Sequence, residues 1–193
     1  MPNHSLDLGP INTETVSTCT WNPSDKHAST TLSSGNMIAD GSGGARGTTS
    51  ASAGRYYVEY YLSENIGGYT SGAGFATAVP TPGAYNTTGV VAYLVNEAVV
   101  RVNGTTTAID NGTAMVYTDT FSWAFSITAG MAWLAKNNVW VNSGDPETGL
   151  NPTITGITGT WYPYCYLEGE AIQLKVSSSD WIYTPPSGYG AWP

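Results

Sequence analysis

The chain has 193 residues, of which 10% are charged, and its six basic and fourteen acidic side chains give it a net charge of −8. This length suits one domain with a single hydrophobic core, as is usual for β-sandwiches of this size. A negative chain with few, scattered basic residues lacks the positive surface that follows a phosphate backbone, so we expect no nucleic-acid partner.

The beginning of the chain does not have the pattern of a secretory leader. A secretory leader has a basic start followed by an apolar run of roughly 7 to 15 residues, and residues 1–18 have neither. No stretch approaches the roughly 20 apolar residues of a membrane span either. We therefore expect synthesis in a cytoplasm and no membrane partner. Residues 1–18 are predicted to form an N-terminal arm that anchors the protein or contacts a partner, and residues 19–193 one domain.

The cysteines and histidines predict neither a disulfide framework nor a metal centre. Cys19 and Cys165 lie in strand-like apolar patterns and are predicted to be buried free thiols. His4 and His27 have no His or Cys at metal-ligand spacing, which argues against zinc. Asp145 with Glu147 offers oxygen ligands for calcium on a loop, but the spacing matches no known calcium loop, so we expect no metal and no cofactor.

The first glycine-rich stretch, GSGGARG at 41–47, could suggest a phosphate-binding loop. It lacks the Lys-Ser/Thr pair of such loops, and no helical pattern follows it. The stretch is therefore predicted to be a flexible loop.

Alternating apolar residues predict three clear strands, because successive side chains of a strand point to opposite faces. RYYVEYYL at 55–62 is predicted to be a half-buried strand. FSWAFSI at 121–127 and AIQLKV at 171–176 show the same alternation. The residues expected to face the core are Tyr56, Val58, Tyr60 and Leu62 in the first strand, Phe121, Trp123, Phe125 and Ile127 in the second, and Ile172, Leu174 and Val176 in the third.

The stretch WLAKNNVWVNSGDP at 133–146 predicts a tight hairpin, because Asn tolerates the positive φ angles of a two-residue turn. With Asn137 and Asn138 as the turn, Lys136 faces Val139 and Ala135 faces Trp140. Trp133 and Trp140 then share one face, and we expect this face to pack against an opposite sheet.

Clusters of Gly, Pro, Asn and Ser separate these strands, and no long helical pattern competes with them. Short strands with turn residues between them predict an all-β protein with few or no helices, an antiparallel β-sandwich or jelly roll.

The hairpin stretch WLAKNNVWVNSGDPETGLNP resembles the late hairpin of the SPRY family in its bacterial and phage branch. GRYYVEYYL, GAGFATA and GITGTWYPYCYLEGEAIQLKV resemble successive strands of that family, and YTPPSGYGAW resembles its terminal clamp. The resemblance covers about residues 20–192 and is weakest between Val79 and Thr118. The turn departs from the family's Asn-Gly, and Trp123 and Phe125 stand at positions that are usually aliphatic, which indicates a divergent member.

The SPRY resemblance implies two antiparallel sheets packed as in concanavalin A. It also implies binding rather than catalysis, with specificity carried by loops at one end of the sandwich. The candidate ligand-binding residues lie in loops: Tyr69, Tyr85, Asn86, Asp145 and Glu147. The alternatives are that the tyrosines only cover the bases of loops and that the two acids are solvated turn residues.

An enzyme is the less favoured alternative. Glu59, Glu168 and Glu170 could supply a pair of carboxylates for a carbohydrate-active enzyme, but the sequence does not place them at the required separation. No Gly-x-Ser-x-Gly motif marks a nucleophile that His27 could serve as base. We therefore expect no enzymatic activity.

The phage-type resemblance and the neutral, Tyr/Asn/Thr/Ser-rich composition favour a structural protein of a bacteriophage virion, a capsid decoration, fibre or tail component. Its expected partners are a host-surface glycan or protein, or neighbouring virion proteins, and a homo-oligomer is possible. The alternative is a cytoplasmic SPRY-type adaptor that binds proteins.

Overall fold

The computed structural model describes residues 17–64, 70–110, 115–116 and 118–193, and Tyr69 lies outside this part of the chain. In the described part every regular element is a strand except one short 3-10 turn, η1 (Val141–Ser143), and no helix there is long and apolar enough to span a membrane. The strands are β1 (Trp21–Lys26), β2 (Thr30–Ser33), β3 (Ile38–Gly47), β4 (Arg55–Glu64), β5 (Gly72–Ala76), β6 (Val90–Leu94), β7 (Val99–Val102), β8 (Thr105–Thr107), β9 (Thr120–Ser126), β10 (Met131–Lys136), β11 (Val139–Trp140), β12 (Ile154–Thr155), β13 (Tyr162–Glu168) and β14 (Ala171–Lys175).

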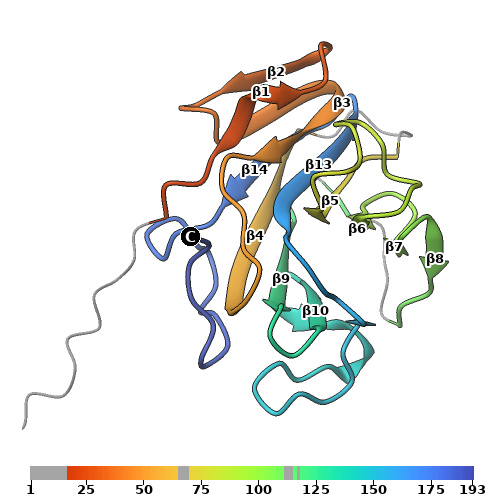
Figure 1. The fold of residues 1–193 in the computed structure, drawn as a ribbon, viewed down its shortest axis with the longest axis vertical. Helices are drawn as coiled ribbons and strands as arrows, with labels where there is room; N and C mark the ends of the chain where they lie inside the picture. Colours follow the sequence, from red (N-terminus) through yellow and green to blue (C-terminus); the bar gives the residue numbers. More distant parts are fainter. Residues whose placement is uncertain (1–16, 65–69, 111–114, 117) are drawn as a thin grey trace, which may run out of the picture.

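The strands form two antiparallel layers that share one strand (Figure 1). The first sheet has the order β11-β10-β9-β4-β14-β3-β2, with β12 also paired to β10. The second has the order β1-β3-β13-β5-β6-β7-β8. This arrangement confirms the predicted all-β sandwich.

Strand β3 passes from the first sheet into the second. Its beginning pairs with β2 and β14, whereas its end pairs with β13 and β1. Gly41, Gly43 and Gly44, with φ angles of 103°, 107° and 146°, lie where the change occurs. Such angles are open to glycine but strained for other residues. The prediction of a flexible loop at 41–47 is therefore wrong: the glycines bend a paired strand.

The hydrophobic core lies between the two sheets and is rich in aromatic rings. Phe75 of the second sheet stacks on Phe125 of the first, with 3.9 Å between ring centroids, and Tyr93 contacts Phe121 at 5.3 Å. The side chains predicted to face inward from 55–62, 121–127 and 171–176 are buried in this core, except Tyr56, which is partly buried and packs against it. The three predicted strands and their inner faces are thus confirmed, as are the buried free thiols of Cys19 and Cys165.

The predicted hairpin is confirmed, but its tryptophans pack elsewhere. Asn137 and Asn138 have φ angles of 46° and 65°, and Ala135 pairs with Trp140. Trp133 and Trp140 share a face, as expected. That face is the outer one, where they contact Tyr57 and Tyr189 instead of the opposite sheet. The expectation that this face packs against the opposite sheet is therefore wrong, because the C-terminal segment (residues 177–193) covers it.

The carboxylate of Asp119 holds the hairpin at its turn. The Asn137 side-chain amide donates a hydrogen bond to Oδ1 at 2.7 Å, and the backbone N–H of Val116 donates to Oδ2 at 2.9 Å. The Lys136 ammonium lies 3.1 Å from Oδ2. Partial burial alone would raise the pKa of Asp119, but these donors and the Lys136 charge together lower it below its ordinary value.

The glycine bend of β3 leads to a stability prediction. A Cβ atom on Gly44 would collide with the carbonyl oxygen of Cys165, in addition to the strain of its φ angle. We expect Gly44→Ala to lower the free energy of unfolding by at least about 2 kcal/mol, measured by denaturant titration. Gly35→Ala is the matched control, because its Cβ would meet nothing within 4 Å and only its φ of 65° is strained. Equal losses in the two variants would contradict the role assigned to the bend.

Candidate functional site

The C-terminal segment closes the outer face of the first sheet and is held there by a buried carboxylate. Glu59 on β4 is 0% exposed. It accepts hydrogen bonds from the backbone N–H groups of Ile182 (2.7 Å) and Tyr183 (2.8 Å) and from the Tyr57 hydroxyl (3.0 Å). Trp181 packs edge-on against Tyr57 beside these bonds. The face opposite the core is therefore buried as well, and the strand expected to be half-buried is covered on both sides.

Beyond this clamp, the C-terminal segment enters the core. The Trp192 side chain is fully buried, stacks on Phe75 and donates its indole N–H to the carbonyl of Thr49 at 3.1 Å. The segment is thus fixed at both ends, on the outer face by Glu59 and between the sheets by Trp192.

The loop at 77–89 covers the outer face of the second sheet in a comparable way. Tyr164 accepts a hydrogen bond from the N–H of Gly83 at 2.9 Å and donates to the carbonyl of Ala84 at 2.8 Å. Arg46, 5% exposed, joins the Asp25 carboxylate to the carbonyl of Pro80. Each outer face is thus covered in part, whereas the ends of the sandwich are open to a ligand.

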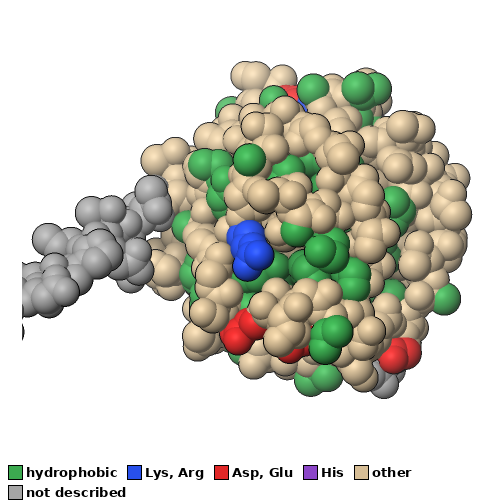
Figure 2. Space-filling view, turned by 60° about the horizontal axis from the view of Figure 1, so that its bottom comes forward, with side chains coloured by type: hydrophobic (Ala, Val, Ile, Leu, Met, Phe, Trp, Pro, Cys, Tyr) green, Lys and Arg blue, Asp and Glu red, His purple; other side chains and the backbone are tan. Residues whose placement is uncertain are grey.

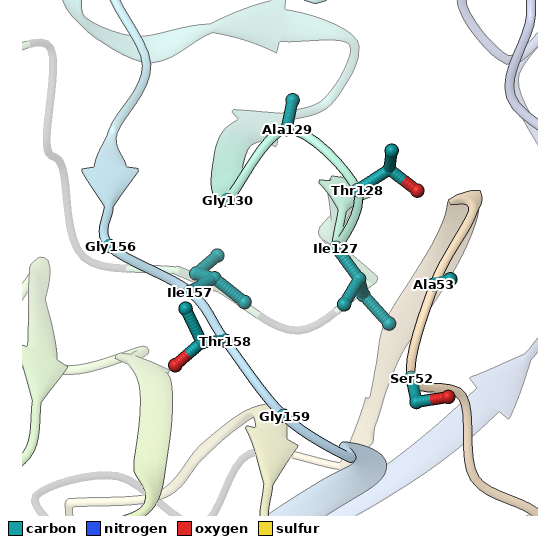
Figure 3. Close-up of a pocket in the computed structure, with 10 residues that line it drawn as sticks. All are labelled: Ser52, Ala53, Ile127, Thr128, Ala129, Gly130, Gly156, Ile157, Thr158 and Gly159. Atoms are coloured by element: carbon teal, nitrogen blue, oxygen red, sulfur yellow. The ribbon is translucent and has the colours of Figure 1, made fainter.

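One end carries a hollow of about 570 Å³ between three connections (Figure 3). Its walls are the link before β4, the β9–β10 turn and the segment after β12. Ile157 points across it towards Ile127 (Figure 3), and these two side chains are only 3% and 6% exposed. The residues that line this end hollow are Ser52, Ala53, Ile127, Thr128, Ala129, Gly130, Gly156, Ile157, Thr158 and Gly159.

A second hollow, of about 360 Å³, lies beside the end hollow and shares Gly156 and Thr158 with it. Its other lining residues come from the loop at 77–89, the β7–β8 turn and Trp161. Val79, at its edge, is 83% exposed, which makes it the most exposed large apolar side chain of the described residues. The two hollows together form one recessed surface with apolar patches.

Figure 2, with this end turned forward, shows hydrophobic side chains gathered on a hollowed face beside a basic side chain. Arg55 begins β4 directly after the wall that Ser52 and Ala53 form, and its side chain is exposed. Its guanidinium lies 5.9 Å from the centroid of the Tyr189 ring. Burial raises the pKa of Tyr189 to about 12, although the Arg55 charge acts against this rise.

The structure places Tyr85 and Asn86 in the loop that covers the second sheet. The Tyr85 ring contacts that of Tyr166, with 4.2 Å between centroids, so it covers the sheet in part. Asn86 is exposed and lies beside Gly104 of the β7–β8 turn. Asn103 of the same turn lines the second hollow, so Asn86 lies next to the recessed surface. Ligand binding by these two residues stays a prediction.

Asp145 and Glu147 form hydrogen bonds with residues of their own loop and of the C-terminal segment. The Asp145 carboxylate accepts from the Thr148 hydroxyl at 2.6 Å and from the N–H of Glu147 at 2.9 Å, and the Thr148 bond lowers its pKa. Glu147 accepts from the N–H of Ser187 in the C-terminal segment at 2.7 Å. Asp145 thus shapes its own loop, and Glu147 fixes the C-terminal segment. Ligand binding by the two acids stays a prediction.

Of the three carboxylates considered for catalysis, Glu59 is held apart from the other two. Glu59 pairs with Lys175, whereas Glu170 lies five residues before Lys175, just beyond the other end of β14 and about 16 Å away along the strand. Glu170 is fully buried and bonded to the Ser71 hydroxyl and the Asn96 amide.

Glu168, close to Glu170 in sequence, also has a structural role. It accepts a hydrogen bond from the N–H of Thr70 at 2.9 Å and another from the Tyr166 hydroxyl. In the described ranges, no group of three or more His, Cys, Asp or Glu residues could hold a metal ion.

Comparison with known structures supports the fold. The SPRY domain of human HERC1 superposes with a TM-score of 0.64 at 16% identity, over 80% of this chain and 96% of that one. The TRIM65 PSpry domain gives 0.62 at 12% identity, over 81% and 88%. Stonustoxin gives 0.61 at 18% identity, over 81% of this chain and 27% of its own. No protein-family model and no curated protein sequence matches the chain. The chain therefore has the fold of SPRY domains.

The sequence did not single out the end hollow or Arg55. The connections that form the hollow contain only small, apolar and hydroxyl residues, a composition shared by most of the turns in this chain. A basic residue at the start of a strand is equally unremarkable in sequence. The one signal in the sequence that could have drawn attention to Arg55 is that basic residues are scarce, since only six residues are Lys or Arg.

The Glu59 clamp is testable by substitution. Glu59→Ala leaves two backbone N–H groups and a buried hydroxyl without their acceptor, so we expect the free energy of unfolding to fall by at least about 3 kcal/mol. Cleavage within residues 177–193 by a protease should accelerate. Glu59→Gln, which keeps one acceptor oxygen, should lose less.

The control for this prediction is Glu97→Ala, which removes an exposed carboxylate of the same type. Stability of Glu59→Ala equal to that of Glu97→Ala would show that the clamp does not hold the segment.

Proposed function

We propose that this chain is a non-enzymatic binding domain that recognises a protein through the end hollow and its neighbour. The observation that carries the proposal is the combination of an aliphatic floor, Ile127 and Ile157, with an exposed rim of small residues. A concave apolar surface with few polar groups is the usual form of a ligand site. Small rim residues let the ligand reach the backbone of the domain.

The walls of the end hollow are fixed before any ligand binds. The N–H of Ile127 donates to the carbonyl of Gly54 at 3.0 Å, and the Thr128 hydroxyl accepts from the N–H of Gly54 at 2.8 Å. The N–H of Ile157 donates to the carbonyl of Gly130 at 3.1 Å. These bonds join all three connections, so little ordering entropy opposes binding.

A protein ligand suits this surface better than a glycan. Sugar recognition commonly uses an exposed aromatic ring, and the end hollow has none among its lining residues. Its floor suits an aliphatic side chain of a partner instead. A host-surface protein and a neighbouring virion subunit both remain within this proposal.

The biological setting that we propose is a bacteriophage virion, with the domain on the capsid or tail. The support is the phage-type resemblance of residues 133–152 and the neutral surface chemistry implied by 10% charged residues. The second candidate is a cytoplasmic adaptor, which would use the same hollow for a soluble partner.

Mass spectrometry of purified virions tests the setting. If the domain is a virion component, its peptides should be present in stoichiometric amounts in gradient-purified particles and persist after salt washing. Detection only in the soluble fraction of infected cells would favour the adaptor.

Obstruction of the end hollow tests the binding surface. Peptides selected on the purified chain from a displayed random library should bind Ala53→Trp and Ala129→Trp at least tenfold more weakly, because an indole at either exposed position crowds the hollow. Ala28→Trp, in the β1–β2 turn away from the hollow, is the matched control and should bind normally. Unchanged affinity in both hollow variants, or glycan binding that both abolish on an array, would overturn a protein ligand at this site.

A further inference from the structure

Arg55 is the basic side chain of the described residues that has neither an ion pair nor a hydrogen bond. Each of the other basic residues has a partner: Arg46 binds Asp25, Arg101 binds Glu97, Lys136 binds Asp119, and Lys26 and Lys175 bind the carbonyls of Thr30 and Asp180. In a chain with a net charge of −8, an unpaired cation beside a hollow is a departure from the general pattern. Its guanidinium donors are available to a ligand.

Arg55 lies next to two walls of the end hollow, one in sequence and one across the sheet. Arg55 follows Ala53 by two residues, so their Cα atoms are at most about 7 Å apart. Its strand partner is Ser126, which directly precedes Ile127 of the hollow floor. The Tyr189 ring lies under the guanidinium, and its hydroxyl reaches the carbonyl of Pro146 at 3.4 Å. An aromatic surface of this kind orients a planar cation without consuming its hydrogen-bond donors.

The segment after β12 offers a backbone to an extended ligand. The N–H groups of Thr158, Gly159 and Thr160 make no hydrogen bond to another residue of the described chain, and all three residues are exposed. An extended peptide can bind to such free N–H groups through its own carbonyls. Alternate side chains of that peptide point the same way and lie about 6.6 Å apart, close to the upper bound of about 7 Å between the Cα atoms of Ala53, on the wall of the hollow, and Arg55.

We propose that the end hollow binds an acidic peptide segment, with an aliphatic side chain in the hollow and an Asp or Glu two positions away on the Arg55 guanidinium. Guanidinium and carboxylate form two parallel hydrogen bonds, which fixes the register of the peptide as well as its charge. This inference rests on the proposed function, since it names the class of ligand for the same surface.

The test is selection from a displayed random-peptide library on the purified full chain, followed by affinity measurement on variants. Peptides selected by the unmodified protein should be enriched in an acid two positions from Val, Ile or Leu. Arg55→Gln should weaken their binding at least tenfold, and Arg55→Glu should shift selection towards basic residues. Arg101→Gln is the matched control: it removes one positive charge from the same chain, at a site already paired with Glu97, and should bind normally.

The outcomes separate this inference from the proposed function. Peptides that need the hollow but carry no acid, or that bind Arg55→Gln as tightly as the unmodified chain, would overturn the role of Arg55 and leave the hollow as the binding site. Equal weakening by Arg55→Gln and Arg101→Gln would also overturn it, because it would indicate general charge attraction. Selection of no peptide at all, with an acidic glycan bound instead, would overturn both the peptide and the protein ligand.

Discussion

The two sheets of this domain depend on one strand that belongs to both. Strand β3 pairs with β2 and β14 in one layer and with β13 and β1 in the other, and the bend between these parts needs backbone angles that only glycine adopts without strain. Because β3 fixes where the layers meet, it sets the distance across which Phe75 reaches Phe125. The aromatic core and the position of every end loop follow from that geometry.

A sandwich usually leaves the outer faces of its sheets to solvent, but this one covers both in part. The C-terminal segment covers the first sheet and the loop at 77–89 covers the second, each held by hydrogen bonds to buried side chains. Covered outer faces leave the ends of the sandwich as the candidate surfaces for recognition. There the connections are short and bonded to one another, which gives a preformed surface instead of a mobile one.

Much of the fold could be predicted from the sequence, because period-two alternation reports directly which side chains face inward. The assignments for 55–62, 121–127 and 171–176 and the register of the Asn137-Asn138 turn depend only on local rules of this kind. Alternation also placed Trp133 and Trp140 on one face. It could not tell which of two apolar faces meets the other sheet, because that depends on a segment more than 40 residues later in the chain. The glycine-rich composition of residues 41–47 led to the wrong prediction of a flexible loop for a similar reason, because a bend within a paired strand and a free loop are both rich in glycine. The end hollow forms where three connections that are distant in sequence come together, and no local sequence pattern predicts that they do.

The buried position of Trp192 also has a consequence for biosynthesis. The core is assembled from residues spread between Trp21 and Trp192, so nearly the whole described chain contributes to it. The ribosome synthesises the chain from its N-terminus, and a domain generally folds as a unit. Until Trp192 has emerged, the stacked pair Phe75 and Phe125 lacks its contact with the Trp192 ring, and the outer face around Tyr57 lacks its cover. The nascent chain therefore leaves these two aromatic surfaces incompletely covered until residues 177–193 have been synthesised.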